Sequence, residues 1–293
     1  MNNNYGQLHI VATPIGNLED ITIRAIRILK EVDFICAEDT RNTIKLLNHF
    51  DIRTKMISYH EHNKYDKAIE IIKLLKDNKN VAIVTDAGTP IISDPGFELV
   101  DMCYKERINV TSIPGASALI CAVTLSGINS DEFLFIGFLS ANKKDKKNKL
   151  LELKNEKHTM IFYISPHKLL STLEDLINTF SKNRFASISR EMTKIHEETI
   201  RGSLEYIYNY FSNKEIKGEF VIVIKGNDEE EVIYNKPIKT EYNELLNQGL
   251  SDKEAMKKIS LDRKIDKRIV YKEVKQINGD NNENSRDTKS YTT

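Results

Sequence analysis

The chain has 293 residues, of which 40% are hydrophobic and 29% charged, and its 43 basic and 43 acidic residues cancel. This composition is typical of a globular protein and leaves room for more than one domain. A net charge of zero excludes attraction of nucleic acid by the chain as a whole, so any such binding must come from local basic patches.

The cysteines and the chain start bear on the compartment. Cys36, Cys103 and Cys121 stand far apart in apolar contexts, which excludes a CxxC pair and favours buried thiols in a reducing compartment. The first residues lack the basic and apolar regions of a signal peptide. No apolar run reaches the ~20 residues needed to span a membrane. We therefore expect a cytoplasmic protein without a membrane segment.

The first 127 residues alternate short apolar runs with amphipathic stretches. The expected strands are 7–12, 33–37, 81–85 and 108–113. One expected helix follows Asp20, a plausible N-cap, and another runs from Lys64 to Lys76. Strands that alternate with helices predict a mainly parallel sheet covered on both faces.

A second α/β block is predicted from about 131 to 226. Its strand-like runs are EFLFIGF, TMIFYI, RFASISRE and EFVIVIKG, with helices expected near 167–180 and 203–212. Consecutive runs at 184–191 and 194–201 suggest a hairpin, so this sheet should be mixed rather than parallel. Turn residues at Gly127–Ser130 separate the two blocks.

The remainder is predicted to be a small helical module and a tail. An acidic run, Asp228 to Glu231, ends the second block, and Ser251 with Glu254 forms a capping box that opens a helix. The last residues lack apolar periodicity, which predicts disorder. The resulting divisions are an α/β domain 1–127, an α/β domain 128–228, a helical module 236–276 and a disordered tail 277–293.

Three expected strands run into loops rich in glycine, proline and small polar residues. These loops are ATPIGN at 12–17, DAGTPIISDPG at 86–96 and PGASA at 114–118. Open α/β sheets bind ligands at the carboxyl ends of their strands, so the loops predict one shared site. Asp86 either lines this site or caps a helix, and Asp94 is expected to cap the helix that contains Phe97.

A series of motifs then narrows the function. In chain order they are TPIGNLEDIT, AEDTR, YHEHN, TDAGTPIISDPG, IPGASA, GFL, FYISPHK and REMTK. Their order and spacing closely resemble the ribosomal RNA small subunit methyltransferase I family of tetrapyrrole-methylase-like enzymes. The resemblance runs from Leu8 to Gly226, and the helical module to about residue 276 is also similar.

The resemblance implies a two-domain α/β fold, a class III methyltransferase, with S-adenosylmethionine held between the domains. It also implies 2′-O-methylation of a cytidine ribose in the decoding region of 16S ribosomal RNA, either naked or in the assembled small subunit, by a homodimer. The residues it places at the cofactor are Pro14, Gly16, Asp86, Gly88, Thr89, Ser117, Ala118 and Tyr163. The first loop, ATPIGN, lacks the glycine-rich pattern of the porphyrin-methylating branches, which favours the RNA branch.

The chemistry asks for a base or an oxyanion partner, because a ribose hydroxyl is a poor nucleophile near neutral pH. Residue types alone do not single out one group, and Glu38 is a further candidate. The residues we assign to catalysis are Asp39, His60, Glu191 and Lys194. Alternatively, Asp39 and Arg41 would make a local ion pair at a helix start. His60 and His62 could hold a metal, but the sequence shows no third ligand for one.

Local basic patches would bind the RNA, because neutralising phosphates dominates affinity. Residues 141–160 carry seven lysines against three acids, and 236–276 carry eleven basic against seven acidic residues. The residues we assign to RNA are Arg41, His62, Lys143, Lys144, Lys146, Lys147 and Arg190. Solvated helix faces would show the same pattern. Two other functions stay open, a methyltransferase of the same fold for a tetrapyrrole, another small molecule or a protein, and a non-catalytic RNA-binding protein.

Overall fold

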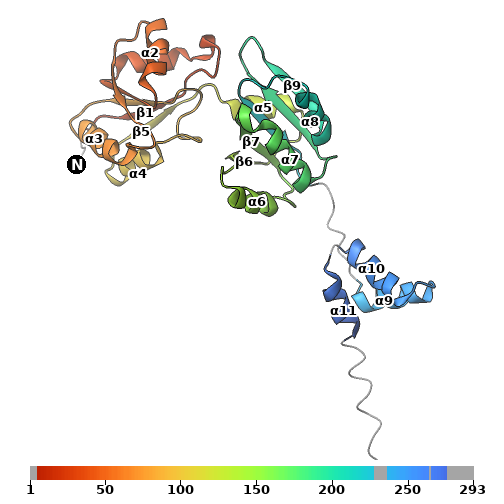
Figure 1. Ribbon diagram of the computed structural model, residues 1–293. Coiled ribbons are helices and arrows are strands. Elements are labelled where there is room, and N and C mark those ends of the chain that lie inside the picture. The colour runs from red at the N-terminus through yellow and green to blue at the C-terminus, as the bar shows by residue number, and fades with distance from the viewer. Residues whose placement is uncertain (1–4, 228–235, 264, 276–293) are drawn as a thin grey trace, which may run out of the picture. The chain divides into compact units, whose positions relative to one another are not determined.

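A computed structural model describes residues 5–227, 236–263 and 265–275. The chain divides into two compact units, Met1–Asn227 and Asp228–Thr293 (Figure 1). The acidic run at 228–231 and the tail at 277–293, for which disorder is predicted, lie outside the described residues.

The first sheet of the larger unit is parallel and has five strands. Their order is β3 (Lys55–Ser58), β2 (Phe34–Ala37), β4 (Val81–Val84), β1 (Leu8–Val11) and β5 (Val110–Ile113). The four predicted strands and the parallel sheet are confirmed. The edge strand β3 was not predicted. It pairs with β2 alone and its residues are less buried than those of β4, so its sequence carries a weaker apolar signal.

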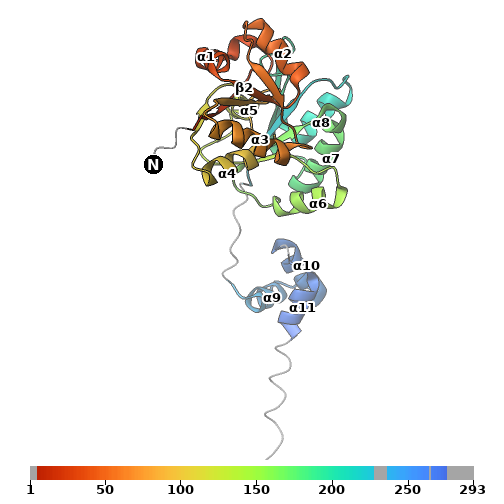
Figure 2. The ribbon, with the colours of Figure 1, turned by 90° about the vertical axis from the view of Figure 1, so that its left-hand side faces the viewer.

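Both faces of this sheet are covered by helices, and β4 shows why its residues are all apolar. Val81 and Ile83 pack toward α3 (Lys64–Lys76) and α4 (Phe97–Lys105). Ala82 and Val84 point the other way, toward α1 (Ile23–Glu31) and α2 (Thr40–His49). Figure 2 shows α1 and α2 on one side of β2 and α3 and α4 on the other.

Two predicted helix caps are wrong. The N-cap of α1 is Thr22, whose Oγ1 accepts the N–H of Ala25 at 3.1 Å, while Asp20 ends the short 3₁₀ helix η1 (Leu18–Asp20). The N-cap of α4 is Gly96, at a φ of +141°. Asp94 instead accepts a hydrogen bond from the Thr85 hydroxyl, so its carboxylate serves the loop rather than the helix.

The second sheet is mixed, as predicted. Its strand order is β6 (Phe133–Phe138), β7 (Thr159–Ile164), β10 (Phe220–Ile224), β8 (Phe185–Arg190) and β9 (Glu198–Ser203). β6 and β7 are parallel and the other pairs antiparallel, which confirms the hairpin of β8 and β9.

Helices cover both faces of this sheet as well. α6 (Lys143–Glu152), α7 (Leu169–Phe180) and α8 (Leu204–Ser212) share one apolar core with it. On the opposite face, α5 (Ala118–Ser126) packs Ala122 and Val123 against Ile161 and Val223. α5 thus follows β5 in the chain but covers the second sheet, and both sheets belong to one compact unit. The domain boundary at Gly127–Ser130 stays a prediction.

The second unit is a three-helix module made of α9 (Ile238–Asn247), α10 (Asp252–Asp262) and α11 (Lys267–Lys275) (Figure 2). Its core is formed by Leu245, Ala255, Ile259 and Val270. The predicted capping box is present, and the Glu254 carboxylate accepts the N–H of Ser251 at 3.0 Å. Within the described residues, no helix is long and apolar enough to cross a membrane.

Candidate functional site

The three turn-rich loops lie side by side because β4, β1 and β5 are neighbours in a parallel sheet. Thr13 and Gly88 exchange backbone hydrogen bonds, N–H to O, at 2.9 and 3.1 Å. The hydroxyl of Thr89 donates to the carbonyl of Ala116 at 3.3 Å. These bonds tie the loop after β4 to the loops after β1 and β5.

A cavity of about 450 Å³ opens at this edge, and we call it the central cavity. The first sheet contributes its loops after β1, β2, β4 and β5, and the second sheet contributes the ends of β6 and β7 and the start of β10. Six of the eight residues predicted at the cofactor line it: Asp86, Gly88, Thr89, Ser117, Ala118 and Tyr163. Pro14 and Gly16 do not, although Ile15 between them does.

Carboxylates gather on one wall of the central cavity. Glu38, Asp86 and Asp94 all line it, and the Thr85 hydroxyl lies 2.8 Å from Asp94 Oδ2 and 3.3 Å from Glu38 Oε2. Burial and the nearby Asp94 and Asp86 charges raise the pKa of Glu38, and burial also raises the pKa of Asp94. Such a wall favours a positively charged ligand or a group that gives up a proton.

Asp86 has two roles in the structure. Its carboxylate lines the central cavity and accepts hydrogen bonds from the Asp39 N–H at 3.3 Å and the Asn42 side chain at 3.0 Å. It therefore holds the start of α2, whereas the sequence left open a choice between lining a site and capping a helix.

Asp39, which we assigned to catalysis, does not line the central cavity. It is the N-cap of α2 and pairs with Arg41 at 2.7 Å. The hydrogen bonds from Arg41 lower the pKa of Asp39 to about 2. The local geometry is that of the predicted ion pair at a helix start, and a strongly ionised carboxylate is a weak base. The RNA contact assigned to Arg41 stays a prediction.

His60 and His62 follow β3. His60 is half-buried and does not line the central cavity. His60 Nδ1 is buried and has no hydrogen-bond partner within the described part of the chain. The exposed His62 ring packs edge-on to that of His60, with centroids 6.0 Å apart. Among the described residues no cluster of three potential metal ligands is found.

Glu191 and Lys194 lie in the connection between β8 and β9, next to the first loop, ATPIGN. Lys194 Nζ pairs with Glu191 at 2.9 Å and with Glu219, a residue of the central cavity, at 3.1 Å. Burial opposes both charges, yet these hydrogen bonds lower the pKa of Glu191 and raise that of Lys194. A Cβ at Gly16 would lie 2.5 Å from Lys194 Cγ, so glycine is needed for this approach. Lys194 thus packs against the first loop, and the N–H of Asn17 in that loop donates to Thr193 Oγ1 at 3.1 Å.

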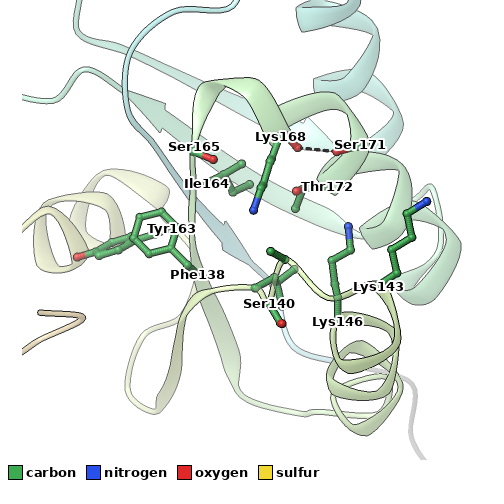
Figure 3. Close-up of a pocket in the computed structure, with 12 residues that line it drawn as sticks. Phe138, Ser140, Lys143, Lys146, Tyr163, Ile164, Ser165, Lys168, Ser171 and Thr172 are labelled. Carbon is green, nitrogen blue, oxygen red and sulfur yellow. Dashed lines mark hydrogen bonds between the residues drawn. The ribbon is translucent and has the colours of Figure 1, made fainter. Parts of the chain in front are cut away.

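A second cavity, of about 290 Å³, shares Phe138, Tyr163, Ile164 and Ser165 with the central cavity. We call it the lysine pocket, because Lys143, Lys146 and Lys168 line it. Lys168 and Lys146 extend toward its middle from η2 (Pro166–Lys168) and α6 (Figure 3).

The other predicted RNA residues lie elsewhere. Lys144 and Lys147 are exposed on α6 and do not line the lysine pocket. Arg190 donates to the Lys217 carbonyl at 2.7 Å and lines an outer groove with Glu191 and Lys214.

Sequence reasoning named Glu38 only as a further candidate and did not assign Asp94, Glu219, Phe138 and Lys168 to the site. A signal for Glu38 was present, since it follows strand β2 directly, as Asp86 follows β4 within one residue. Phe138 stands in the motif GFL, which carried the resemblance, whereas no signal marks Glu219, because its place depends on how the second sheet meets the first.

Solved structures define the class of this fold. The chain matches cobalt precorrin-4 methyltransferase at a TM-score of 0.58 and 16% identity, over 75% of this chain and 94% of that one. It matches uroporphyrin-III C-methyltransferase from Thermus thermophilus, complexed with S-adenosyl homocysteine, at a TM-score of 0.53 and 15% identity, over 74% and 97%. This likeness shows the fold alone, that of a class III methyltransferase.

Sequence relatives are much more similar. Residues 7–207 match the family model of the tetrapyrrole (corrin/porphyrin) methylases. Ribosomal RNA small subunit methyltransferase I of Halalkalibacterium halodurans is 49% identical over 271 residues, 91% of this chain and 93% of the relative. The protein of that name from Thermotoga maritima is 47% identical over 223 residues, 76% of this chain and all of the relative. The chain therefore belongs to the tetrapyrrole methylase family, in the group of the ribosomal RNA small subunit methyltransferase I proteins.

Proposed function

We propose that the protein transfers a methyl group from S-adenosylmethionine to the ribose 2′-oxygen of a cytidine in the decoding region of small-subunit ribosomal RNA. The observation that carries the proposal is an acidic cavity, lined by loops of the first sheet and strand ends of the second, in a chain 49% identical to a ribosomal RNA methyltransferase. The position and the base identity of the acceptor rest on the family resemblance.

The residues of the central cavity fit the cofactor. Its volume of about 450 Å³ lies in the range of small-molecule sites. Ile15 and Tyr163 offer apolar surface, while Asp86 and Asp94 suit a cationic ligand. Gly88, at a φ of +87°, has no Cβ and lets the loop after β4 pass close to Ile15.

When bound, S-adenosylmethionine would supply an electrophilic methyl group, with its positively charged sulfur as the leaving group. The chain's part is to align the acceptor and take its proton. Glu38 suits the second task, because its raised pKa makes it a stronger base than an ordinary carboxylate and it lines the cavity. Of the assigned residues, Lys194 packs against the first loop at Gly16 and is paired with Glu191, and the role assigned to His60 stays a prediction.

We also propose that the protein works as a homodimer in the cytoplasm. α5 is apolar around most of its circumference, yet Ile120 and Leu125 are 49% and 43% exposed. A helix of this kind is usually covered, which supports a second copy on its outer side. The three free cysteines support a reducing compartment.

Incubation with tritiated S-adenosylmethionine tests the function. Small ribosomal subunits, their naked RNA and a tetrapyrrole are offered side by side. We expect label in ribosomal RNA and none in the tetrapyrrole. Label in the tetrapyrrole alone would support the small-molecule function, and absence of cofactor binding in equilibrium dialysis would support the non-catalytic one.

A further inference from the structure

The two adjoining cavities carry opposite charge. Among the residues that the structure describes, the central cavity is lined by Glu38, Asp86, Asp94 and Glu219 and by no lysine or arginine. The described lining of the lysine pocket has three lysines and no aspartate or glutamate. Phosphates are repelled by the first and attracted by the second, so a polyanion that reaches both must divide its groups between them.

Two of the three lysines are uncommitted. Lys146 pairs with Asp175 at 2.5 Å, whereas Lys143 and Lys168 form no ion pair within the part of the chain that the structure describes. Both are exposed, so their ammonium groups remain available to a ligand. The unpaired positive charge of the pocket therefore comes from Lys168, which extends toward its middle, and from Lys143, whose side chain lines it and extends away from that middle (Figure 3).

Hydroxyl groups complete an anion site. Ser140, Ser165 and Thr172 line the lysine pocket, together with Ser171, whose hydroxyl donates to the Lys168 carbonyl at 3.1 Å. Ser140 accepts the N–H of Asn142 at 3.1 Å, which leaves its own hydroxyl proton free to donate. Ser165 stands at the N-cap of η2 without a capping hydrogen bond, so its hydroxyl is uncommitted there. Hydroxyls beside lysines are typical phosphate ligands.

The two aromatic side chains that line both cavities, Phe138 and Tyr163, favour a phosphate that belongs to a nucleic acid strand. Phe138 and Tyr163 pack edge to face, with ring centroids 5.4 Å apart, and both rings line both cavities (Figure 3). A ligand that passes this wall meets an aromatic surface suited to stacking a base. A strand with its ribose in the central cavity would therefore bring a neighbouring phosphate to the lysines.

We propose that the lysine pocket binds a phosphodiester of the acceptor RNA, next to the nucleotide that enters the central cavity. This inference rests on the proposed function, since the RNA must place its ribose at the carboxylate wall. It assigns the specific contacts to Lys143 and Lys168 and leaves Lys144 and Lys147 only a diffuse attraction.

Two double variants of equal charge test the pocket. Lys143→Ala with Lys168→Ala removes the uncommitted lysines, and Lys144→Ala with Lys147→Ala removes two exposed lysines outside the pocket. Lys146 is left intact because its loss would strand Asp175. Methylation of small subunits is measured over a range of salt, with cofactor affinity by equilibrium dialysis as a check on folding.

The pocket variant should lose about tenfold in kcat/KM, and the slope of its logarithm against the logarithm of salt should fall by about one unit. The control should lose less than about threefold, and cofactor affinity should stay unchanged in both. Equal losses in both variants would overturn the lysine pocket as a binding site. The proposed function would stand in that case, provided that the natural protein methylates the small subunits. Absence of methylation by the natural protein would overturn both.

A neutral phosphate places the contact on the strand. RNA carrying one methylphosphonate beside the acceptor should be a poorer substrate for the natural protein and no poorer than unmodified RNA for the pocket variant. Competition by millimolar inorganic phosphate, without any effect of the methylphosphonate, would assign the pocket to a free anion and overturn the RNA contact.

Discussion

Glu38 and Asp39 are adjacent in the chain and have opposite electrostatic surroundings. Glu38 lines the central cavity, where burial and neighbouring carboxylates raise its pKa. Asp39 lies outside, where Arg41 lowers its pKa to about 2. Glu38 is therefore suited to accept a proton, whereas Asp39 is suited to hold a helix end.

We predict that Glu38→Gln lowers kcat by about 10²–10⁴-fold, the range for loss of a general base. The natural protein should gain activity as pH rises through the raised pKa of Glu38, because only the carboxylate accepts a proton. Glu38→Gln should lose that limb of the pH–rate profile. Asp39→Asn is the matched control, and it should keep the limb. An unchanged profile in Glu38→Gln would exclude Glu38 as the base.

The same pair predicts opposite effects on stability. Because the pKa of Glu38 is raised in the folded protein, the folded state binds this proton more tightly than the unfolded chain does. Stability is therefore lost as pH rises from the unfolded pKa through the folded pKa of Glu38. Glu38→Gln should therefore raise Tm at pH 7–8 and have little effect near pH 4. Asp39 stabilises the fold above its ordinary pKa, and Asp39→Asn should lower Tm at pH 7 and have little effect near pH 2.

Differential scanning calorimetry measures both shifts, which for a unit of this size amount to about 2–4 °C for each kcal/mol. A lower Tm for Glu38→Gln at pH 8 would contradict the burial of an unfavourable charge at this position.

At the scale of elements, the sequence predicts what depends on local pattern. Alternating apolar residues and turn signals predicted β1, β2, β4 and β5 and the mixed second sheet. They did not predict β3, since four residues at a sheet edge carry little apolar signal. Asp20 and Asp94 were wrongly expected to cap helices, because Thr22 and Gly96 reach those positions instead.

From local pattern, the candidate site was predictable only where it lies on loops after strands of the first sheet, and Tyr163 of the second sheet came from the family resemblance. Asp86 and Ser117 follow strands that the sequence predicts, and both line the central cavity. Glu219 and Phe138 reach the cavity from the second sheet, Glu219 next to β10 and Phe138 at the end of β6. Their position there depends on long-range packing, which no local pattern encodes.

α5 allows a prediction about assembly. Ile120→Asp places a charge on its exposed apolar side and should convert the proposed homodimer into monomers. Ile69→Asp on α3 is the control, since Ile69 is 50% and Ile120 49% exposed. Sedimentation velocity distinguishes the species. A natural protein that sediments as a monomer, or a dimer that survives Ile120→Asp, would contradict this interface.

At the scale of the whole molecule, the two compact units predict separable roles. The relative from Thermotoga maritima is matched over its whole length by 223 residues, 76% of this chain. A chain that ends at Asn227 keeps both sheets and the central cavity. We expect it to fold and to bind S-adenosylmethionine with unchanged affinity in equilibrium dialysis, whereas loss of cofactor binding would show that the helical module supports the site.

The central claim is that the protein methylates a ribose 2′-oxygen of small-subunit ribosomal RNA. The most direct measurement uses small subunits reconstituted with RNA whose target cytidine is 2′-deoxy, alongside subunits with the natural ribose. Tritiated S-adenosylmethionine should label the natural subunits and leave the 2′-deoxy subunits unlabelled. Equal label in the two would place the methyl group on another atom and contradict the claim.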